Sequence, residues 1–195
     1  PESESLMVTG TGGQAGGVFN AGIYVGNSFN EEESGGTISS RGGNVLVQGQ
    51  GGGIEQGWTY GIWVNNDGIV SAGGSGNVTV TGTGGTGSAD FNTGVVVSAE
   101  LGDARITSNG GDVLVEGQGV GTALSGNNRG VFLWKGGVIT AGETGSVTVV
   151  GNGGHSETLG DHGVLIDNLS EDGRRSTITS GGGVLTVTGT GGTGA

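Results

Sequence analysis

An internal repeat of 33–39 residues runs through the whole chain and constrains its fold more than any other feature. The first unit of the repeat is clearest at Val78–Gly85, which reads VTVTGTGG, an apolar-x-apolar-x-Gly-x-Gly-Gly pattern. Six copies of this unit occur, and their second apolar residues are Val8, Val47, Val80, Val115, Val149 and Val187. A period of this length is typical of proteins whose repeats stack on one another.

Two further short units recur inside each repeat. The second unit is Gly-apolar-x-apolar, and its first apolar residues are Ile23, Ile62, Val95, Val131 and Val164. The third unit centres on Ile38, Val70, Ile106, Ile139 and Ile178. Alternation of apolar and polar residues, with β-branched side chains at the apolar positions, predicts a strand for each unit. Glycine pairs between the units suit tight corners with positive φ.

These strands predict an all-β parallel β-helix, a β-solenoid, because no single repeat can bury its own apolar face. The chain then forms one segment, 1–195, with about 5.5 repeats and three short strands in each: 6–44, 45–77, 78–112, 113–146, 147–184 and a partial 185–195. The preference for right-handed crossovers between parallel strands predicts a right-handed coil. Two smaller coils per repeat are the alternative, although only one large coil gives the third unit a place.

The composition agrees with a solenoid. Glycine supplies 51 of the 195 residues and only 31% are hydrophobic, which disfavours a helical protein because glycine destabilises helix interiors. The alternation places 27 large apolar residues inside: two from each first unit, two from each second unit and one from each third unit. Burial of that many side chains is enough for a continuous core.

Charge and residue types exclude several functions. The net charge of −12 disfavours nucleic acid and anionic membranes as partners. No apolar stretch is long enough to span a bilayer, so we expect no membrane insertion. The chain has no cysteine, which rules out disulfides and thiolate metal sites.

We expect no catalytic, cofactor-binding or metal-binding residues. The basic side chains fall at unrelated phases of the repeat, and His155 and His162 lie in or beside a glycine-rich connection. Gly84–Asp90 departs from calcium-binding glycine-rich repeats because its aspartate comes one place late. Adventitious calcium at acidic loops such as 31–33 is the only metal we allow for.

Two outward-facing surfaces are candidates for contacts. Threonines on the first unit form partial ladders that suit ice binding, but Leu46, Gln48 and Gln50 interrupt them. The second unit presents an apolar column, and an exposed column of this kind marks a contact surface. The contact column consists of Tyr24, Trp63, Val96, Phe132, Trp134 and Leu165. We weigh three alternatives for it: cover by the preceding connection (Phe19, Trp58, Phe91, Leu124 and Leu159), contact with a partner, and stacking on glycans.

The repeat resembles those of very large bacterial surface and secreted proteins of the filamentous-haemagglutinin-like or adhesin-like parallel β-helix group. The resemblance lies in VTVTGTGG, then N-x-G-V-x-V, then I-T-S-x-G-G, and covers nearly the full length. Asn20, Asn92 and Asn128 supply the motif asparagine, whereas Thr59 and Asp161 depart from it. The resemblance implies architecture and a stalk-like role, and it carries over no catalytic residue.

We therefore expect a non-enzymatic extracellular or cell-surface rod, structural or adhesive. The chain begins and ends at the same phase of the repeat with no polar cap, so we expect a segment of a larger fibre protein. Expected partners are the chain itself, end to end or laterally, adjoining repeats and surface glycans. The alternative is a β-helix that binds or processes carbohydrate, and ice binding is a more remote one.

Overall fold

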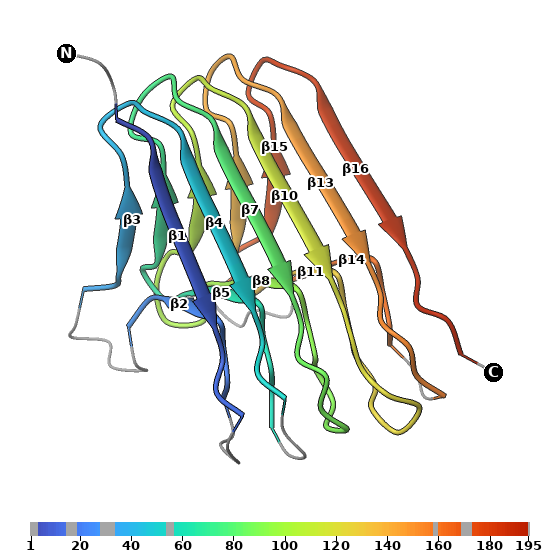
Figure 1. The fold of residues 1–195 in the computed structure, drawn as a ribbon. Coiled ribbons are helices and arrows are strands. Elements are labelled where there is room, and N and C mark those ends of the chain that lie inside the picture. Colours follow the sequence, from blue (N-terminus) through green and yellow to red (C-terminus); the bar gives the residue numbers. More distant parts are fainter. Residues whose placement is uncertain are drawn as a thin grey trace.

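The chain folds into three parallel β-sheets that wrap around one core (Figure 1). The computed structural model describes residues 4–14, 19–27, 34–53, 57–157, 160–168 and 173–194, and these ranges contain strands and no helix. The first sheet holds β1 (Leu6–Thr11), β4 (Val45–Gln50), β7 (Val78–Thr83), β10 (Val113–Gln118), β13 (Val147–Asn152) and β16 (Leu185–Thr190). The second holds β2 (Ile23–Val25), β5 (Ile62–Asn65), β8 (Val95–Ser98), β11 (Val131–Trp134) and β14 (Val164–Asp167). The third holds β3 (Thr37–Ser39), β6 (Ile69–Ser71), β9 (Arg105–Thr107), β12 (Val138–Thr140) and β15 (Thr177–Thr179).

Each strand pairs with its own copy in the next repeat, in the register that the sequence predicts. Val80, for example, lies between Val47 and Val115 in the first sheet. Ile106 likewise lies between Val70 and Ile139 in the third sheet. One repeat is therefore one coil with three strands, and the alternative of two smaller coils per repeat is wrong.

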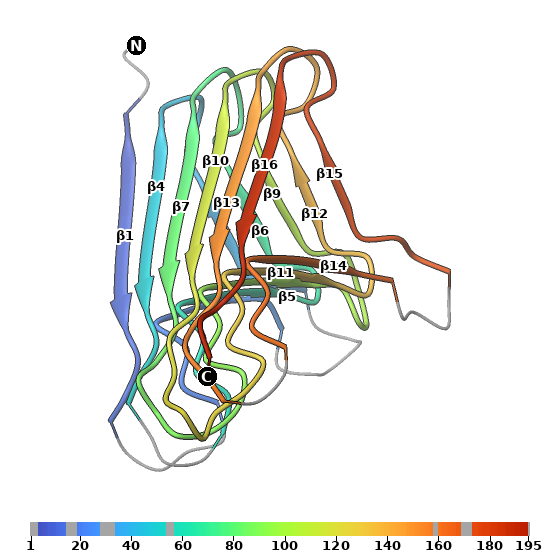
Figure 2. The same ribbon diagram turned by 90° about the vertical axis from the view of Figure 1, so that its right-hand side faces the viewer.

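The coil is right-handed. In Figure 2 the first sheet runs downward, the second crosses below it, and the third runs back upward while the chain advances toward the viewer (Figure 2). This sense of rotation agrees with the general preference for right-handed crossovers between parallel strands.

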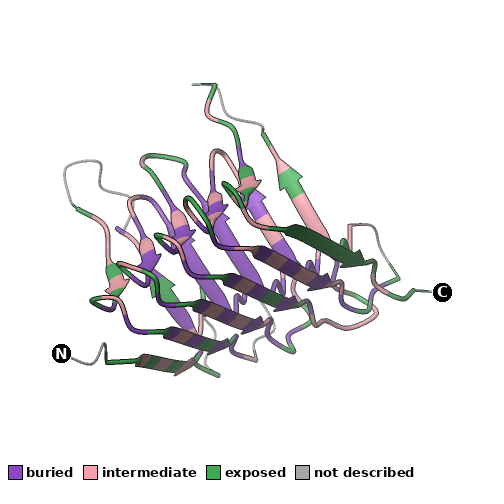
Figure 3. Cartoon of the chain, turned by 90° about the horizontal axis from the view of Figure 1, so that it is seen from above, coloured by how far each residue is buried: buried purple, intermediate pink, exposed green. Residues whose placement is uncertain are grey.

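The predicted inward residues form a single core along the coil axis. All of them belong to it except Ile166, Leu185 and Val187, which are exposed in the last coil. Figure 3 shows that the central strands are mostly buried and the end coils more exposed. Neighbouring coils therefore supply the burial that no coil has alone.

Two glycine columns set the shape of each coil by close approach of the backbone. A Cβ on Gly82, in the first sheet, would lie 2.2 Å from the carbonyl oxygen of Gly94 at the start of the second. The same contact recurs at Gly10, Gly49, Gly117 and Gly151. The chain between the two columns is thereby extruded as a lobe below the second sheet (Figure 2). Positive φ, the role predicted for the glycine pairs, applies instead at the corners before the first sheet, as at Gly73 and Gly142.

Candidate functional site

The contact column lies on the outer side of the second sheet, as predicted. Trp63 pairs with Tyr24 on one side and Val96 on the other, and Phe132 pairs with Val96 and Leu165. Trp134 ends β11 on the same side as Phe132, and their rings stack with centroids 6.1 Å apart. The column is thus continuous, but its members differ greatly in exposure.

The lobe covers the middle of the column. Trp63 is 7% exposed and Val96 only 2%, whereas Tyr24 remains 38% exposed. Phe19 stacks on Trp63 with ring centroids 5.7 Å apart, and Phe91 packs against the cluster of Tyr60, Trp63 and Val96. The prediction of cover is therefore confirmed for Trp63 and Val96, which are not available as contact residues.

Other parts of the predicted cover behave differently. Leu124 is 79% exposed and covers nothing, so its assignment to the cover is wrong. Its loop turns at Thr122 and Ser125, whose mutual hydrogen bonds of 2.8 and 3.0 Å hold it away from the sheet. Leu159 lies outside the described residues.

Arg129 closes this surface and was not recognised as part of it from the sequence. Its guanidinium carbon lies 4.4 Å from the ring centre of Phe132 and 5.4 Å from that of Phe91. The Nη2 group donates a hydrogen bond of 2.7 Å to Oδ1 of Asn127. Burial lowers the pKa of Arg129, and the same burial raises the pKa of neighbouring Tyr60. The signal available in the sequence was position, because Tyr60 and Arg129 both immediately precede the second-unit glycine.

An exposed remnant of aromatic surface is left beside the covered part. We call it the aromatic corner and define it as Phe19, Tyr24 and Trp58, which are 46%, 38% and 37% exposed. Phe19 meets Trp58 edge to face at 5.2 Å, and Tyr24 meets buried Trp63 at 5.0 Å. Chemically, the corner offers ring faces and one phenol hydroxyl in the first two coils.

The motif asparagines line the inside of the lobe and are structural. Oδ1 of Asn128 accepts hydrogen bonds from the backbone and side-chain nitrogens of Asn92, at 3.2 and 3.0 Å. Oδ1 of Asp161 accepts one of 2.8 Å from the backbone of Asn128, and Thr59 donates to Asn92. The two departures from the motif thus keep a polar partner at the same level of the ladder.

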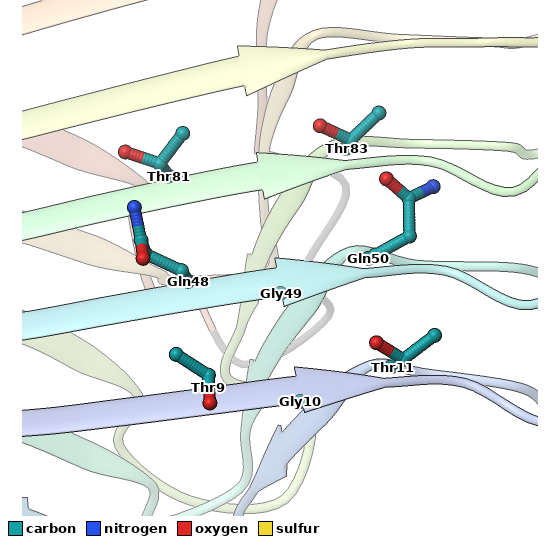
Figure 4. Close-up of a pocket in the computed structure, with 8 residues that line it drawn as sticks. All are labelled: Thr9, Gly10, Thr11, Gln48, Gly49, Gln50, Thr81 and Thr83. Atoms are coloured by element: carbon teal, nitrogen blue, oxygen red, sulfur yellow. The ribbon is translucent and has the colours of Figure 1, made fainter.

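The outer face of the first sheet is a flat polar surface with a shallow depression. Thr9, Thr11, Gln48, Gln50, Thr81 and Thr83 line it together with Gly10 and Gly49 (Figure 4). Gln48 lies between Thr9 and Thr81, and Gln50 between Thr11 and Thr83, so the threonine rows are interrupted as predicted. A second depression beside β7 and β10 is lined by Asn77, Val78, Thr79, Asp112, Val113, Leu114, Ser146 and Thr148.

No group of three or more His, Asp or Glu side chains that could hold a metal occurs in the described ranges. The carboxylate of Asp90, in the departed calcium pattern, accepts a hydrogen bond of 2.6 Å from the backbone of Gly126. Residues 31–33 lie outside the described ranges. Arg105 pairs with Asp103, and Lys135 pairs with Glu100, in separate coils.

Across the described residues, no helix is long and apolar enough to cross a membrane. The chain matches no protein-family model, and comparisons with curated proteins and with solved structures give no significant match. Fold and surface therefore define the molecule as a parallel β-solenoid with a three-sheet coil.

Proposed function

We propose that this chain is a segment of a non-enzymatic extracellular rod, structural or adhesive, within a larger repetitive cell-surface or fibre protein. The observation that carries the proposal is the unbroken register, in which every coil adds the same three strands to one core. Such a coil converts chain length into a stiff axis and presents its side chains at fixed intervals of about 4.8 Å. The resemblance to adhesin-like repeats supports the same role.

Surface labelling of cells that make the protein tests its location. Antibodies against the 195-residue chain are applied to intact cells and, separately, to permeabilised cells. Labelling of intact cells, lost after brief external proteolysis, is the expected result. Labelling that requires permeabilisation contradicts the extracellular role.

Carbohydrate binding is the second candidate, and the exposure of the aromatic corner favours it. Aromatic ring faces are suitable platforms for the apolar faces of sugars, and Trp58 is the largest exposed ring. Binding to immobilised glycans that is lost in Trp58→Ala and retained in Leu124→Ala supports this function. Absence of binding by the unmodified chain removes it.

A further inference from the structure

The two ends of the solenoid carry the same strand. β1 reads LMVTGT and β16 reads LTVTGT, so they differ only at Met7 and Thr186, whose side chains point outward. As a result the first sheet has six strands, while the second and third sheets have five each. The chain is therefore one strand longer in the first sheet than a whole number of coils requires.

This mismatch determines how two molecules can join end to end. If β1 of one molecule simply stacked on β16 of another, the second and third sheets would each lack one strand at the junction. If β1 instead occupies the place of β16, every molecule contributes five strands to each sheet. β14 then pairs with β2 of the second molecule, and β15 pairs with β3.

We propose that the chain self-assembles by strand exchange, with β1 of one molecule displacing β16 of the next. The exchanged contacts in the first sheet are nearly equivalent, because β1 brings Leu6, Val8 and Gly10 to the positions of Leu185, Val187 and Gly189. The added pairs in the other two sheets, and the burial of Ile166, are the gain. Exchange of an identical element is a low-cost route to assembly.

β16 is the strand that leaves, because it is the less protected of the two. All six of its residues are exposed, and Leu185 and Val187 are 45% and 44% exposed although they point inward. In β1 the alternate residues Leu6, Val8 and Gly10 are half-buried against the core. This inference names the partner for the proposed structural role and rests on that role.

Cysteine cross-linking tests the exchange, because the chain contains no cysteine of its own. In β16, Thr188 pairs with Val150 of β13, so exchange brings Thr9 of a second molecule beside Val150. Neighbouring in-register strands lie about 4.8 Å apart, within the Cα range for a disulfide. Thr9→Cys chains are mixed with Val150→Cys chains and oxidised, and a covalent dimer is expected.

Two parallel mixtures identify the junction. Thr9→Cys with Thr188→Cys cross-links only if intact ends stack, and Thr9→Cys with Thr81→Cys reports random collision, because β7 is paired on both sides. A dimer in either mixture that equals the Val150 yield, or no dimer in any, overturns the exchange. Circular dichroism verifies that each variant is folded.

Point variants distinguish the roles of the two strands. Val187→Asp weakens the docking of β16 in its own molecule, so the yield of the Thr9–Val150 cross-link rises. Val8→Asp weakens the incoming strand, so the yield is lost. Equal losses in both variants overturn the exchange. None of these outcomes bears on surface labelling of cells, so failure of the exchange and failure of the structural role are distinguishable.

Discussion

At the scale of single residues, glycine and one buried aromatic surface set the behaviour of the chain. The motif glycines permit two backbones to touch, as at Gly82 and Gly94, and most of them do not adopt positive φ. The sequence shows that these glycines recur, but it cannot show which of two reasons, conformation or space, requires each one. That distinction depends on a contact between strands of different sheets.

Replacement of Gly82 by alanine tests the close approach. The new Cβ would lie 2.2 Å from a backbone oxygen, so strands must move apart, and we expect a loss of about 1–3 kcal/mol in unfolding free energy. Gly189→Ala is the matched control in the same column, since its nearest atom is 3.1 Å away. Urea unfolding measures both variants, and equal losses contradict the explanation.

Alkaline pH tests the burial of Tyr60, whose side chain is 7% exposed. Burial raises its pKa above the ordinary tyrosine value of about 10. The unfolded chain therefore releases the phenol proton first, and stability falls as the pH rises beyond about 10. Tyr60→Phe is expected to reduce this slope, while Tyr24→Phe, at the other tyrosine, keeps it. Unfolding free energies from pH 8 to 11 measure the slope, and an unchanged slope in Tyr60→Phe is the contrary result.

At the scale of elements, the strands follow from the sequence and the lobes do not. Alternation and spacing predict all three sheets and their register, because each strand pairs with a residue at a fixed distance along the chain. The lobes vary in sequence from coil to coil, and their contacts, such as Arg129 between Phe91 and Phe132, join different coils. The outward alternation of the contact column was thus predictable, while its partial burial depended on non-periodic connections.

The polar ladder inside the lobe is expected to make a large contribution to stability. Asn128 is fully buried, and its amide also donates to Ser125 at 3.1 Å, in addition to its bonds with Asn92. Asn128→Ala leaves buried partners unsatisfied, at a cost of about 2–3 kcal/mol. Asn109→Ala, at an exposed corner, is the control with little expected change. Chemical unfolding monitored by circular dichroism compares the two, and a small effect at Asn128 argues that water replaces its bonds.

At the scale of the whole molecule, stability is distributed along one axis. Each coil contacts only its neighbours, so the central coils gain from both sides and the end coils from one. Burial follows this order, since β7 and β10 alternate between buried and more exposed residues while β16 is exposed throughout. Assembly between molecules therefore begins at strands that are the least stable within each molecule.

Hydrogen exchange as a function of protein concentration combines these arguments in one measurement. In dilute protein we expect slow exchange in β7 and β10 and fast exchange in β16. With strand exchange, a rise in concentration protects the amides of β14 and β15, which gain partners at the junction, while those of β16 stay fast because it is released. Stacking of intact ends predicts the opposite, with β16 protected first. A profile that does not change with concentration indicates that each molecule keeps its own β16 and remains alone.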